Sequence, residues 1–482
     1  MGSTSDVGRR DLIKRAAALG LIAVPTMSTL AACASGGGDD DKKDAKGKKS
    51  KKNPLGVKAD AAIEIHIFNG GFSDQYAKDA EKIYKSSYPK ADVQHKAGQQ
   101  IGRALQPRMA QGDPPDVINN SGDGNMDVQA LLKNKQLEPL NDLMDAPSWD
   151  DPNKTVRETL VPGTAEMGQF GDDKVYVLYI AYGVYGVWYG NAMLKKLDVE
   201  YPKTWDAMLD VCKKAKAKGI AGWTYAGAHP RYVSFTMFPQ ICQVGGYEAL
   251  KNIDNLEPNA WKSDAVKTVF EAYEELVAKG YVLKGSSSMD HTKSQQRWAE
   301  GKAVFIPNGN WLENESKKYI EDKKYWPDGM DLAIGATPSM TDSDKMPFGT
   351  LYAAAGEPFI IPSSAKNKAG AKEFMRIMYS KKSAQNFTKL VASIPATAGA
   401  ADGMELKPGM TSSLEAIKNA GKNIIVPRFR DFYPELWTDD MNDVCGDLME
   451  GKSTAKEAMD KMQKAADRVA KDDGIKKIKR SD

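Results

Sequence analysis

The sequence predicts an α/β fold built as two lobes, each with a mainly parallel sheet flanked by helices. Segments with strand-like alternation are followed repeatedly by segments with helical periodicity, which is typical of open sheets covered by helices on both faces. The chain also has 482 residues, more than a single hydrophobic core usually serves. Its 41% hydrophobic residues are ordinary for a globular protein.

Residues 1–33 have the features of an export signal. Arg9 and Arg10 precede an apolar run over residues 16–30, and this order resembles the twin-arginine (Tat) signal, with Leu12 where phenylalanine is commoner. The apolar run is short and interrupted by a proline, so a signal peptide fits it better than a membrane span.

The signal ends in "LAAC", which resembles a bacterial lipobox and predicts a lipid (palmitate) on Cys33. An incidental cysteine on an ordinary N-terminal helix is the alternative. Residues 34–57 are rich in glycine, lysine and aspartate, which predicts a disordered tether. A lysine run can also bind nucleic acid, but we expect no nucleic-acid partner for an exported chain with a net charge of only +3. We therefore expect the protein on the outer face of the cell membrane.

The first strands and helices follow the tether. Residues 63–68 alternate isoleucine with other residues and predict a strand, which an Asn-Gly-Gly turn ends. Ser73 is expected to cap the helix that follows. A second strand over residues 91–98 and a helix around Leu105 and Met109 complete this alternation.

The same pattern repeats in the rest of the chain. A long β-rich run covers residues 174–190, and residues 202–219 predict a helix with Thr204 as its N-cap. A strand, a helix, a second strand and a strand–turn–helix unit are then expected over residues 219–227, 263–280, 302–311 and 357–380. From about residue 410 onward the pattern is mostly helical.

Four loops at strand ends are the expected ligand contacts. In open α/β sheets, ligands bind in the crevice outside the ends of the strands. The loops that follow predicted strands in this way cover residues 70–73, 119–125, 223–231 and 308–311.

The cysteines and histidines show no spacing typical of a metal site. Beyond the signal the cysteines are Cys212, Cys242 and Cys445, an odd number, and the four histidines are scattered. Cys212 falls on the apolar face of its helix, which favours a buried thiol, and a Cys212–Cys242 disulfide is the alternative. The acidic stretch from Asp123 onward lacks the glycine and glutamate of a calcium loop. We expect no metal and no cofactor.

Five segments, in the same order, resemble one protein family. They are "IEIHIFNG", "MAQGDPPDVI", "GVWYGNAMLKKLDVEYPKTW", "AEGKAVFIPNGNW" and "IIPSSAKNKAGAKEF", with Gly190 where asparagine is usual. The chain resembles the extracellular solute-binding proteins of carbohydrate ABC importers, the family that contains maltose-binding protein. Within it, "GVYGVWYGN" and "NIIVPRFRDFYPELWTDD" resemble the actinobacterial lipoproteins that bind N-acetylglucosamine and N,N'-diacetylchitobiose.

This resemblance implies a two-lobed periplasmic-binding-protein-like fold with hinge crossings between the lobes. Lobe I would comprise residues 58–179 and 345–400, and lobe II residues 180–344 and 401–482 with the C-terminal helices. A small sugar would bind in the cleft between them and pass to a two-subunit ABC permease with a cytoplasmic ATPase. The resemblance implies a monomeric binder rather than an enzyme.

A sugar site needs aromatic plates for apolar ring faces, and carboxylates, amides or arginine for hydroxyls. The resemblance implies that Trp311 and Trp437 are sugar platforms and that Asp123 accepts sugar hydroxyls. It also implies polar loop contacts from His229 and Arg231.

Five further candidates come from their positions in the predicted fold. They are Phe72 past the first strand, Tyr182 at the lobe crossing, Trp223, and Asn120 and Asn310, whose amides suit an acetamido group or hydroxyls. Of Trp223 and Tyr225, one is expected to point inward and the other outward.

Three other classes compete with the binder of acetylated sugars. A surface glycoside hydrolase would need two carboxylates across the cleft, and no motif singles out such a pair. The sequence also lacks the Gly-x-Ser-x-Gly of serine hydrolases. A peptide or metal binder of the same transport class would share the export signal but not the tryptophan-bearing loops. A binder of another oligosaccharide stays open, because stacking platforms for maltose, cellobiose and chitobiose are similar.

Overall fold

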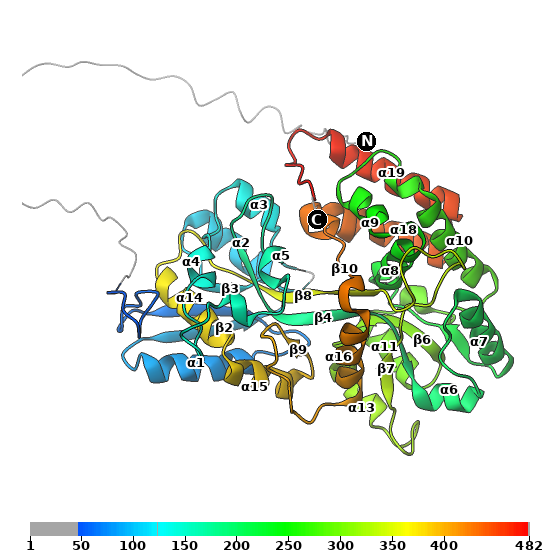
Figure 1. Ribbon diagram of the computed structural model, residues 1–482, viewed down its shortest axis with the longest axis horizontal. Helices are drawn as coiled ribbons and strands as arrows, with labels where there is room; N and C mark the ends of the chain where they lie inside the picture. Colours follow the sequence, from blue (N-terminus) through cyan, green and yellow to red (C-terminus); the bar gives the residue numbers. More distant parts are fainter. Residues whose placement is uncertain (1–46, 123, 481–482) are drawn as a thin grey trace, which may run out of the picture. The chain divides into compact units, whose positions relative to one another are not determined.

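The computed structural model describes residues 47–122 and 124–480 (Figure 1). Arg9, Arg10, Cys33 and Asp123 lie outside the described residues. The predicted signal and lipid attachment site therefore remain predictions.

The last part of the predicted tether is folded. Within residues 47–57, Ser50 and Asn53 form an isolated β-bridge, and the side chains of Leu55 and Val57 are buried in a hydrophobic core. The charged composition of the tether predicted disorder up to residue 57, but these two apolar residues offer enough surface to pack.

A ten-stranded sheet organises the described chain, with its main strands in the order β2-β1-β3-β8-β4-β6-β5. In chain order these strands are β1 (Ile63–Phe68), β2 (Val93–Gly98), β3 (Val117–Asn119), β4 (Val177–Gly190), β5 (Ala221–Trp223), β6 (Ala303–Gly309) and β8 (Leu351–Ile360). The short strands β7 (Leu332–Ile334) and β9 (Ile394–Pro395) pair with β4, and β10 (Ile424–Ile425) pairs with β8.

The sheet is mixed rather than mainly parallel. Strands β1 and β2, β1 and β3, and β5 and β6 pair in parallel. Strand β4 pairs antiparallel with β6 and β8, and β3 pairs antiparallel with β8. Strands β4 and β8 run in opposite directions between the two groups of parallel strands (Figure 1), and a period-two sequence pattern carries no information on the direction of the partner strand.

Helices lie around both groups of strands (Figure 1). Near β1–β3 and in the segments that follow them are α1 (Gln75–Ser87), α2 (Ile101–Gln111), α3 (Val128–Lys133), α4 (Asn141–Met144), α5 (Thr164–Met167), α14 (Lys368–Met378) and α15 (Lys381–Val391). The others are α6 (Asn191–Leu197), α7 (Trp205–Ala217), α8 (Ser234–Gly245), α9 (Tyr247–Asp254), α10 (Asp264–Ala278), α11 (His291–Ala299), α12 (Leu312–Glu315), α13 (Lys317–Ile320), α16 (Pro408–Ala420), α17 (Phe429–Phe432), α18 (Met441–Met449) and α19 (Ala455–Lys471).

One of the two N-caps predicted from the sequence is present in the structure. Thr204 caps α7 as predicted, because its side chain accepts a hydrogen bond from the backbone N–H of Ala207. Ser73 does not cap α1. It has a φ of 54°, and Asp74 occupies the N-cap position without a side-chain cap hydrogen bond.

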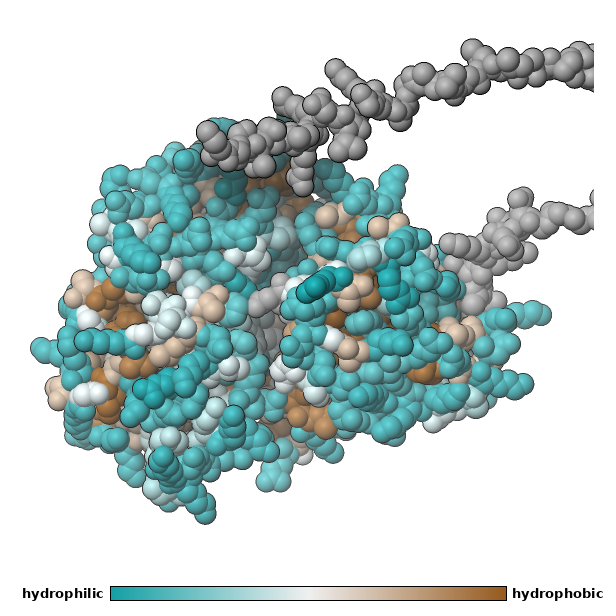
Figure 2. Space-filling view, turned by 180° about the vertical axis from the view of Figure 1, so that it is seen from behind, coloured by the Kyte–Doolittle hydropathy of each residue, from teal (hydrophilic) through white to brown (hydrophobic). Residues whose placement is uncertain are grey.

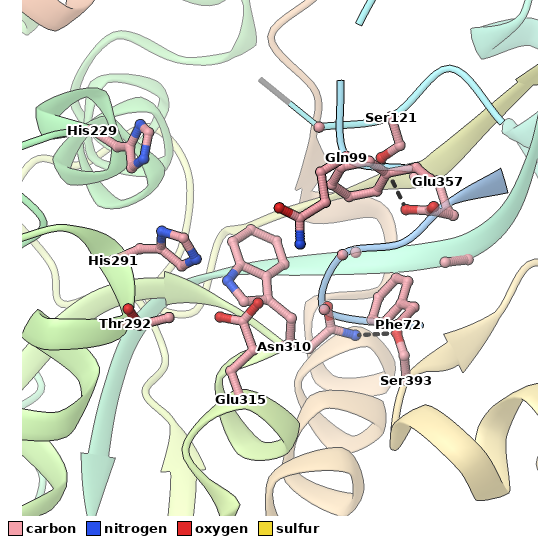
Figure 3. Close-up of a pocket in the computed structure, with 18 of the residues that line it drawn as sticks. Phe72, Gln99, Ser121, His229, His291, Thr292, Asn310, Glu315, Glu357 and Ser393 are labelled. Atoms are coloured by element: carbon pink, nitrogen blue, oxygen red, sulfur yellow. Dashed lines mark hydrogen bonds between the residues drawn. The ribbon is translucent and has the colours of Figure 1, made fainter. Parts of the chain in front are cut away.

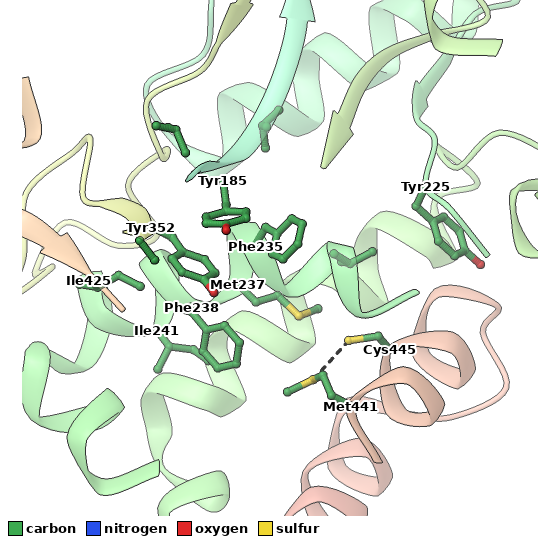
Figure 4. Close-up of a cluster of buried hydrophobic side chains, with 14 of the residues drawn as sticks. Tyr185, Tyr225, Phe235, Met237, Phe238, Ile241, Tyr352, Ile425, Met441 and Cys445 are labelled. Carbon is green, nitrogen blue, oxygen red and sulfur yellow. Dashed lines mark hydrogen bonds between the residues drawn. The ribbon is translucent and has the colours of Figure 1, made fainter. Parts of the chain in front are cut away.

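The buried hydrophobic side chains of the described residues form two clusters. One core holds Ile65, Tyr84 and Phe374. The other holds Trp223 and Tyr273 together with the aromatic and sulfur-containing side chains in Figure 4. The second core also reaches the opposite face of the sheet near β3, so the predicted lobe boundaries remain a proposal.

The cysteines of the described chain, Cys212, Cys242 and Cys445, are free and buried. The prediction of a buried Cys212 thiol is confirmed, and the alternative Cys212–Cys242 disulfide is not formed. Burial raises the pKa of all three thiols. Within residues 47–122 and 124–480, no helix has the length and apolar character needed to cross a bilayer. The face in Figure 2 is mostly hydrophilic, with small scattered apolar areas.

Candidate ligand-binding site

A cavity of about 710 Å³ lies where the loops after β1, β2 and β3 meet the loop after β6 (Figure 3). Strands β4 and β8 pass along it, and residues from α11 and α12 line it as well. Its lining residues are Phe68, Gly70, Gly71, Phe72, Gln99, Gln100, Ser121, Gly122, Gly124, Ala181, Gly183, Tyr185, His229, Tyr232, His291, Thr292, Asn310, Trp311, Glu315, Gly356, Glu357 and Ser393. The volume is typical of sites for small molecules.

Glycines allow the loop after β1 to approach α12 closely. A Cβ atom on Gly71 would lie 2.6 Å from Glu315 Oε1, and the Asn314 side chain donates a hydrogen bond of 3.0 Å to the carbonyl of Gly71. These residues are far apart in sequence, so the contact joins two distant segments of the chain beside the cavity, which Gly71 and Glu315 line. A larger side chain at position 71 would displace the end of the Glu315 side chain.

The aromatic part of the wall is centred on Trp311. Its ring meets Tyr185 at 5.7 Å and Tyr232 at 5.9 Å between centroids, both edge-on. In an edge-to-face pair the edge of one ring lies against the face of the other, and these contacts fix the orientation of the Trp311 ring. One face lies over Gly309, where a Cβ would come within 2.1 Å of the Trp311 ring. The arrangement holds Trp311 as a platform in the cavity wall.

Two carboxyl groups line the cavity. Burial raises the pKa of Glu357 to about 7, against the lowering effects of Asn119 and Ser121. Burial also raises the pKa of Glu315, opposed by a 2.8 Å hydrogen bond from Gln295 and by His291. Both groups therefore hold protons more tightly than exposed glutamates do.

The cavity carries no fixed positive charge in its described lining, which contains neither lysine nor arginine. Its basic side chains are His229 and His291, with ring centroids 5.6 Å apart. Within the described ranges, no group of three or more His, Cys, Asp or Glu side chains is placed to hold a metal ion. The side chains of the described lining therefore present an aromatic face, carboxyl and amide groups, hydroxyls and imidazoles to a ligand.

Comparison with known proteins decides the family. Residues 35–385 match the family described as bacterial extracellular solute-binding protein. The chain is a bacterial extracellular solute-binding protein.

Relatives of this solute-binding protein span almost its whole length. It is 34% identical over 483 residues to the diacetylchitobiose binding protein NgcE of Streptomyces coelicolor, covering 98% of each chain. The solved structure of a chitin oligosaccharide binding protein has a TM-score of 0.65 at 20% identity, covering 84% of this chain and 98% of that one. Unliganded RafE from Streptococcus pneumoniae has a TM-score of 0.64 at 19% identity, covering 85% and 98%. The two structural matches establish the fold.

Four predicted contacts of the solute-binding protein line the cavity: Phe72, His229, Asn310 and Trp311. The Asn310 amide also holds the wall together. It donates to the carbonyl of Tyr182 at 3.2 Å and to Ser393 Oγ at 3.3 Å (Figure 3).

Asn120 and Tyr182 are not among the lining residues. The buried Asn120 amide donates to the carbonyl of Met126 and accepts from its N–H, at 2.9 and 2.8 Å. The side chain of Tyr182 is 7% exposed, and its backbone carbonyl accepts a hydrogen bond from the Asn310 amide. Both residues support the lining of the cavity without being part of it.

The expectation that one of Trp223 and Tyr225 points outward is wrong, because both side chains are buried. Strand β5 ends at Trp223, so Tyr225 lies beyond the strand and the alternation of a strand does not apply to this pair. Trp223 packs in the second core against Trp205 and Phe305.

Arg231 and Trp437 lie one layer behind the lining. The Arg231 guanidinium lies 5.9 Å from the ring centroid of Tyr232, which lines the cavity. Trp437 stacks on Phe235 at 6.2 Å, and Phe235 contacts Trp311 edge-on at 6.2 Å. Asp123 lies outside the described residues.

Several lining residues were missed by the sequence analysis. Gln99 and Gln100 directly follow β2, and the strand-end rule could have found them. Tyr185 and Glu357 lie inside strands, where nothing in the local sequence distinguishes a cavity-facing side chain. Glu315 and His291 are on helices, and only the folded chain shows that they line the cavity.

Proposed function

We propose that this solute-binding protein captures N-acetylglucosamine, N,N'-diacetylchitobiose or both in the cavity and delivers the sugar to the permease of an ABC importer. The Trp311 platform, fixed edge-on by Tyr185 and Tyr232, carries the proposal. The diacetylchitobiose-binding relative, aligned over nearly the whole chain, supports the choice of sugar.

The chemistry of the wall suits an uncharged sugar. The C–H face of a pyranose can stack on the indole of Trp311, while its rim meets the polar side chains around the cavity. Glutamate, glutamine and serine side chains at this rim can accept from or donate to hydroxyls and an acetamido group. Without lysine or arginine in the described lining, an acidic sugar would find no strong partner.

Capture by closure of the two lobes is part of the proposal. Loops from distant segments meet at the cavity, and beside it Asn314 of α12 contacts Gly71 in the loop after β1. A ligand that touches both sides stabilises the closed arrangement because those contacts form together only there. Strands β4 and β8 are the proposed hinge.

Attachment to the membrane completes the proposal. A lipid on Cys33 would keep the protein near its permease at a high effective concentration. Replacing Cys33 with alanine should release the protein into the medium. Retention of the C33A variant on the membrane would contradict the lipid anchor.

The function is tested by calorimetric titration of the protein from Ala34 onward. The sugars are N-acetylglucosamine, N,N'-diacetylchitobiose, maltose, cellobiose and raffinose. We expect tight binding of the acetylated sugars alone, and recovery of the sugars unhydrolysed. Tight binding of another sugar alone would keep the transport role and refute the proposed ligand.

The matched variants are W311A and W149A. Trp149 is partly buried and lies against Arg376, outside the cavity lining. Loss of a central aromatic contact should weaken binding about 10- to 100-fold in W311A, while W149A should bind as the wild type does. If W311A binds the sugars as tightly as W149A does, Trp311 does not contact the ligand.

A further inference from the structure

Glu357 has an unusual backbone conformation in the middle of strand β8. Its φ is 57°, in the left-handed region that glutamate rarely adopts. It also precedes Pro358, which restricts its backbone further. The register between β4 and β8 continues on both sides, with Tyr179 opposite Pro358 and Ala181 opposite Gly356, but the pair between them is absent. Strain of this kind is commonly retained at functional sites.

The strained backbone places the Glu357 side chain at the cavity, next to Ser121 (Figure 3). Ser121 Oγ donates a hydrogen bond of 3.1 Å to Glu357 Oε2. The other oxygen, Oε1, is buried and has no hydrogen-bond partner among the described residues. A buried carboxyl oxygen without a donor is unfavourable, so its retention needs an explanation.

The Asn119 amide acts on Glu357 as a side-chain hydrogen-bond donor and is also engaged with the backbone. Asn119 Nδ2 donates to the carbonyl of Pro358 at 3.0 Å, and the backbone N–H of Asn120 donates to the same carbonyl at 2.8 Å. Asn119 Oδ1 accepts from the backbone of Phe68 and from the Tyr76 hydroxyl. Because the Asn119 amide is shared between Glu357 and the Pro358 carbonyl, Glu357 Oε1 can accept a further hydrogen bond from a ligand in the cavity.

We propose that Glu357 contacts the bound sugar directly, with Oε1 accepting an O–H or N–H from the ligand, and that it determines which sugars bind. The inference rests on the proposed sugar-binding function. It assigns Glu357 to the end of the cavity formed by the loop after β3.

Protonation gives an independent readout of this contact. The pKa of Glu357 is raised to about 7 by burial, and the groups that face it are the neutral Asn119 and Ser121 and the Tyr76 hydroxyl. A ligand donor favours the ionised carboxylate, so binding near pH 7 should release part of a proton. A carboxyl that only held Ser121 in place would show no such release on binding.

The central variant is Glu357→Gly, because glycine adopts a φ of 57° without strain and the variant should fold. We expect it to bind N,N'-diacetylchitobiose about 10- to 100-fold more weakly than the wild type, as for one lost charge-assisted hydrogen bond. Calorimetry in buffers of different ionisation enthalpy should show proton release by the wild type and none by the variant. W149A, whose site lies outside the cavity lining, is the control and should bind as the wild type does.

A ligand-side cycle identifies the donor. Wild type and E357G are each titrated with monodeoxy and N-methylacetamido analogues of N,N'-diacetylchitobiose. We expect one analogue to bind the wild type more weakly than N,N'-diacetylchitobiose does. E357G should bind that analogue and N,N'-diacetylchitobiose with equal affinity, because the variant already lacks the contact. Additive losses for every analogue, or proton release by E357G equal to that of the wild type, would overturn direct contact. Failure of the wild type to bind any acetylated sugar would instead refute the proposed function, and the inference with it.

Discussion

At the scale of single residues, Glu357 links stability to pH in the ligand-free protein. Burial raises its pKa from 4.5 in the unfolded chain to about 7 in the folded one. A raised pKa means that the folded state holds the proton more tightly. The contribution of Glu357 to stability is therefore complete below about pH 4.5 and is lost as the pH rises through about 7.

We expect Glu357→Gln to flatten the pH dependence of the free energy of unfolding across this window, since glutamine does not titrate. Urea denaturation of wild type and E357Q at intervals between pH 4.5 and 8 checks it. If the free energy of unfolding depends on pH in the same way for both proteins, the Glu357 carboxyl does not titrate within this pH window.

The buried ion pair of Asp254 and Arg480 gives a second prediction. Arg480 Nη1 lies 2.6 Å from Asp254 Oδ2, and the two side chains are 8% and 0% exposed. Removing one partner leaves a buried charge uncompensated, so R480A should reduce the free energy of unfolding by about 3–5 kcal/mol. Urea denaturation at neutral pH measures this loss.

The adjacent pair of Lys479 and Glu257 is the matched control, because its side chains are 64% and 43% exposed at a distance of 2.6 Å. K479A should change stability by less than about 1 kcal/mol. The double variant D254N/R480A should recover part of what R480A loses, since the uncompensated charge is gone. If R480A is no worse than K479A, the buried pair does not stabilise the C-terminal segment.

At the scale of elements, the start of α19 is held by a capping box. The Thr454 side chain accepts from the Glu457 N–H, and the Glu457 carboxylate accepts from the Thr454 N–H. T454A should therefore lower the free energy of unfolding by about 1 kcal/mol. Thr411, exposed inside α16, is the control, and T411A should be neutral or slightly stabilising because alanine favours helix interiors.

The elements themselves could largely be predicted from the sequence. The strand over residues 63–68 has the expected bounds, and the cap of α7 is the expected threonine. Alternation and capping act over a few residues, so local sequence reveals them. The antiparallel pairing of β4 with β8 joins segments more than 150 residues apart in sequence, and no local pattern encodes it.

The site could be predicted where it follows strand ends. Phe72 was predicted from its position past a strand, His229 and Trp311 lie in strand-end loops and were predicted from the family resemblance, and all three line the cavity. Glu357 could not be found, because its exposure to the cavity depends on a backbone conformation that glutamate does not favour. Trp223 was predicted to contact the ligand, but its side chain lies in the core. Tryptophan packs well both in a core and against a sugar, so the residue type alone does not distinguish the two.

At the scale of the whole molecule, the proposed closure predicts a change in size. Saturating N,N'-diacetylchitobiose should reduce the radius of gyration measured by small-angle X-ray scattering, because bound sugar favours the closed arrangement. W311A at the same sugar concentration should change less, in proportion to its lower occupancy. Superimposable curves for wild-type protein with and without sugar would contradict closure.

Burial of the three described cysteines makes this protein suitable as a sensor. Cys445 has its pKa raised to about 12, and burial raises the pKa values of Cys212 and Cys242 as well, so none presents a reactive thiolate at neutral pH. In the chain from Ala34 onward, a Thr292→Cys variant would add one exposed thiol at the cavity. A maleimide dye should attach there alone, and its emission would then report the arrival of sugar in real time.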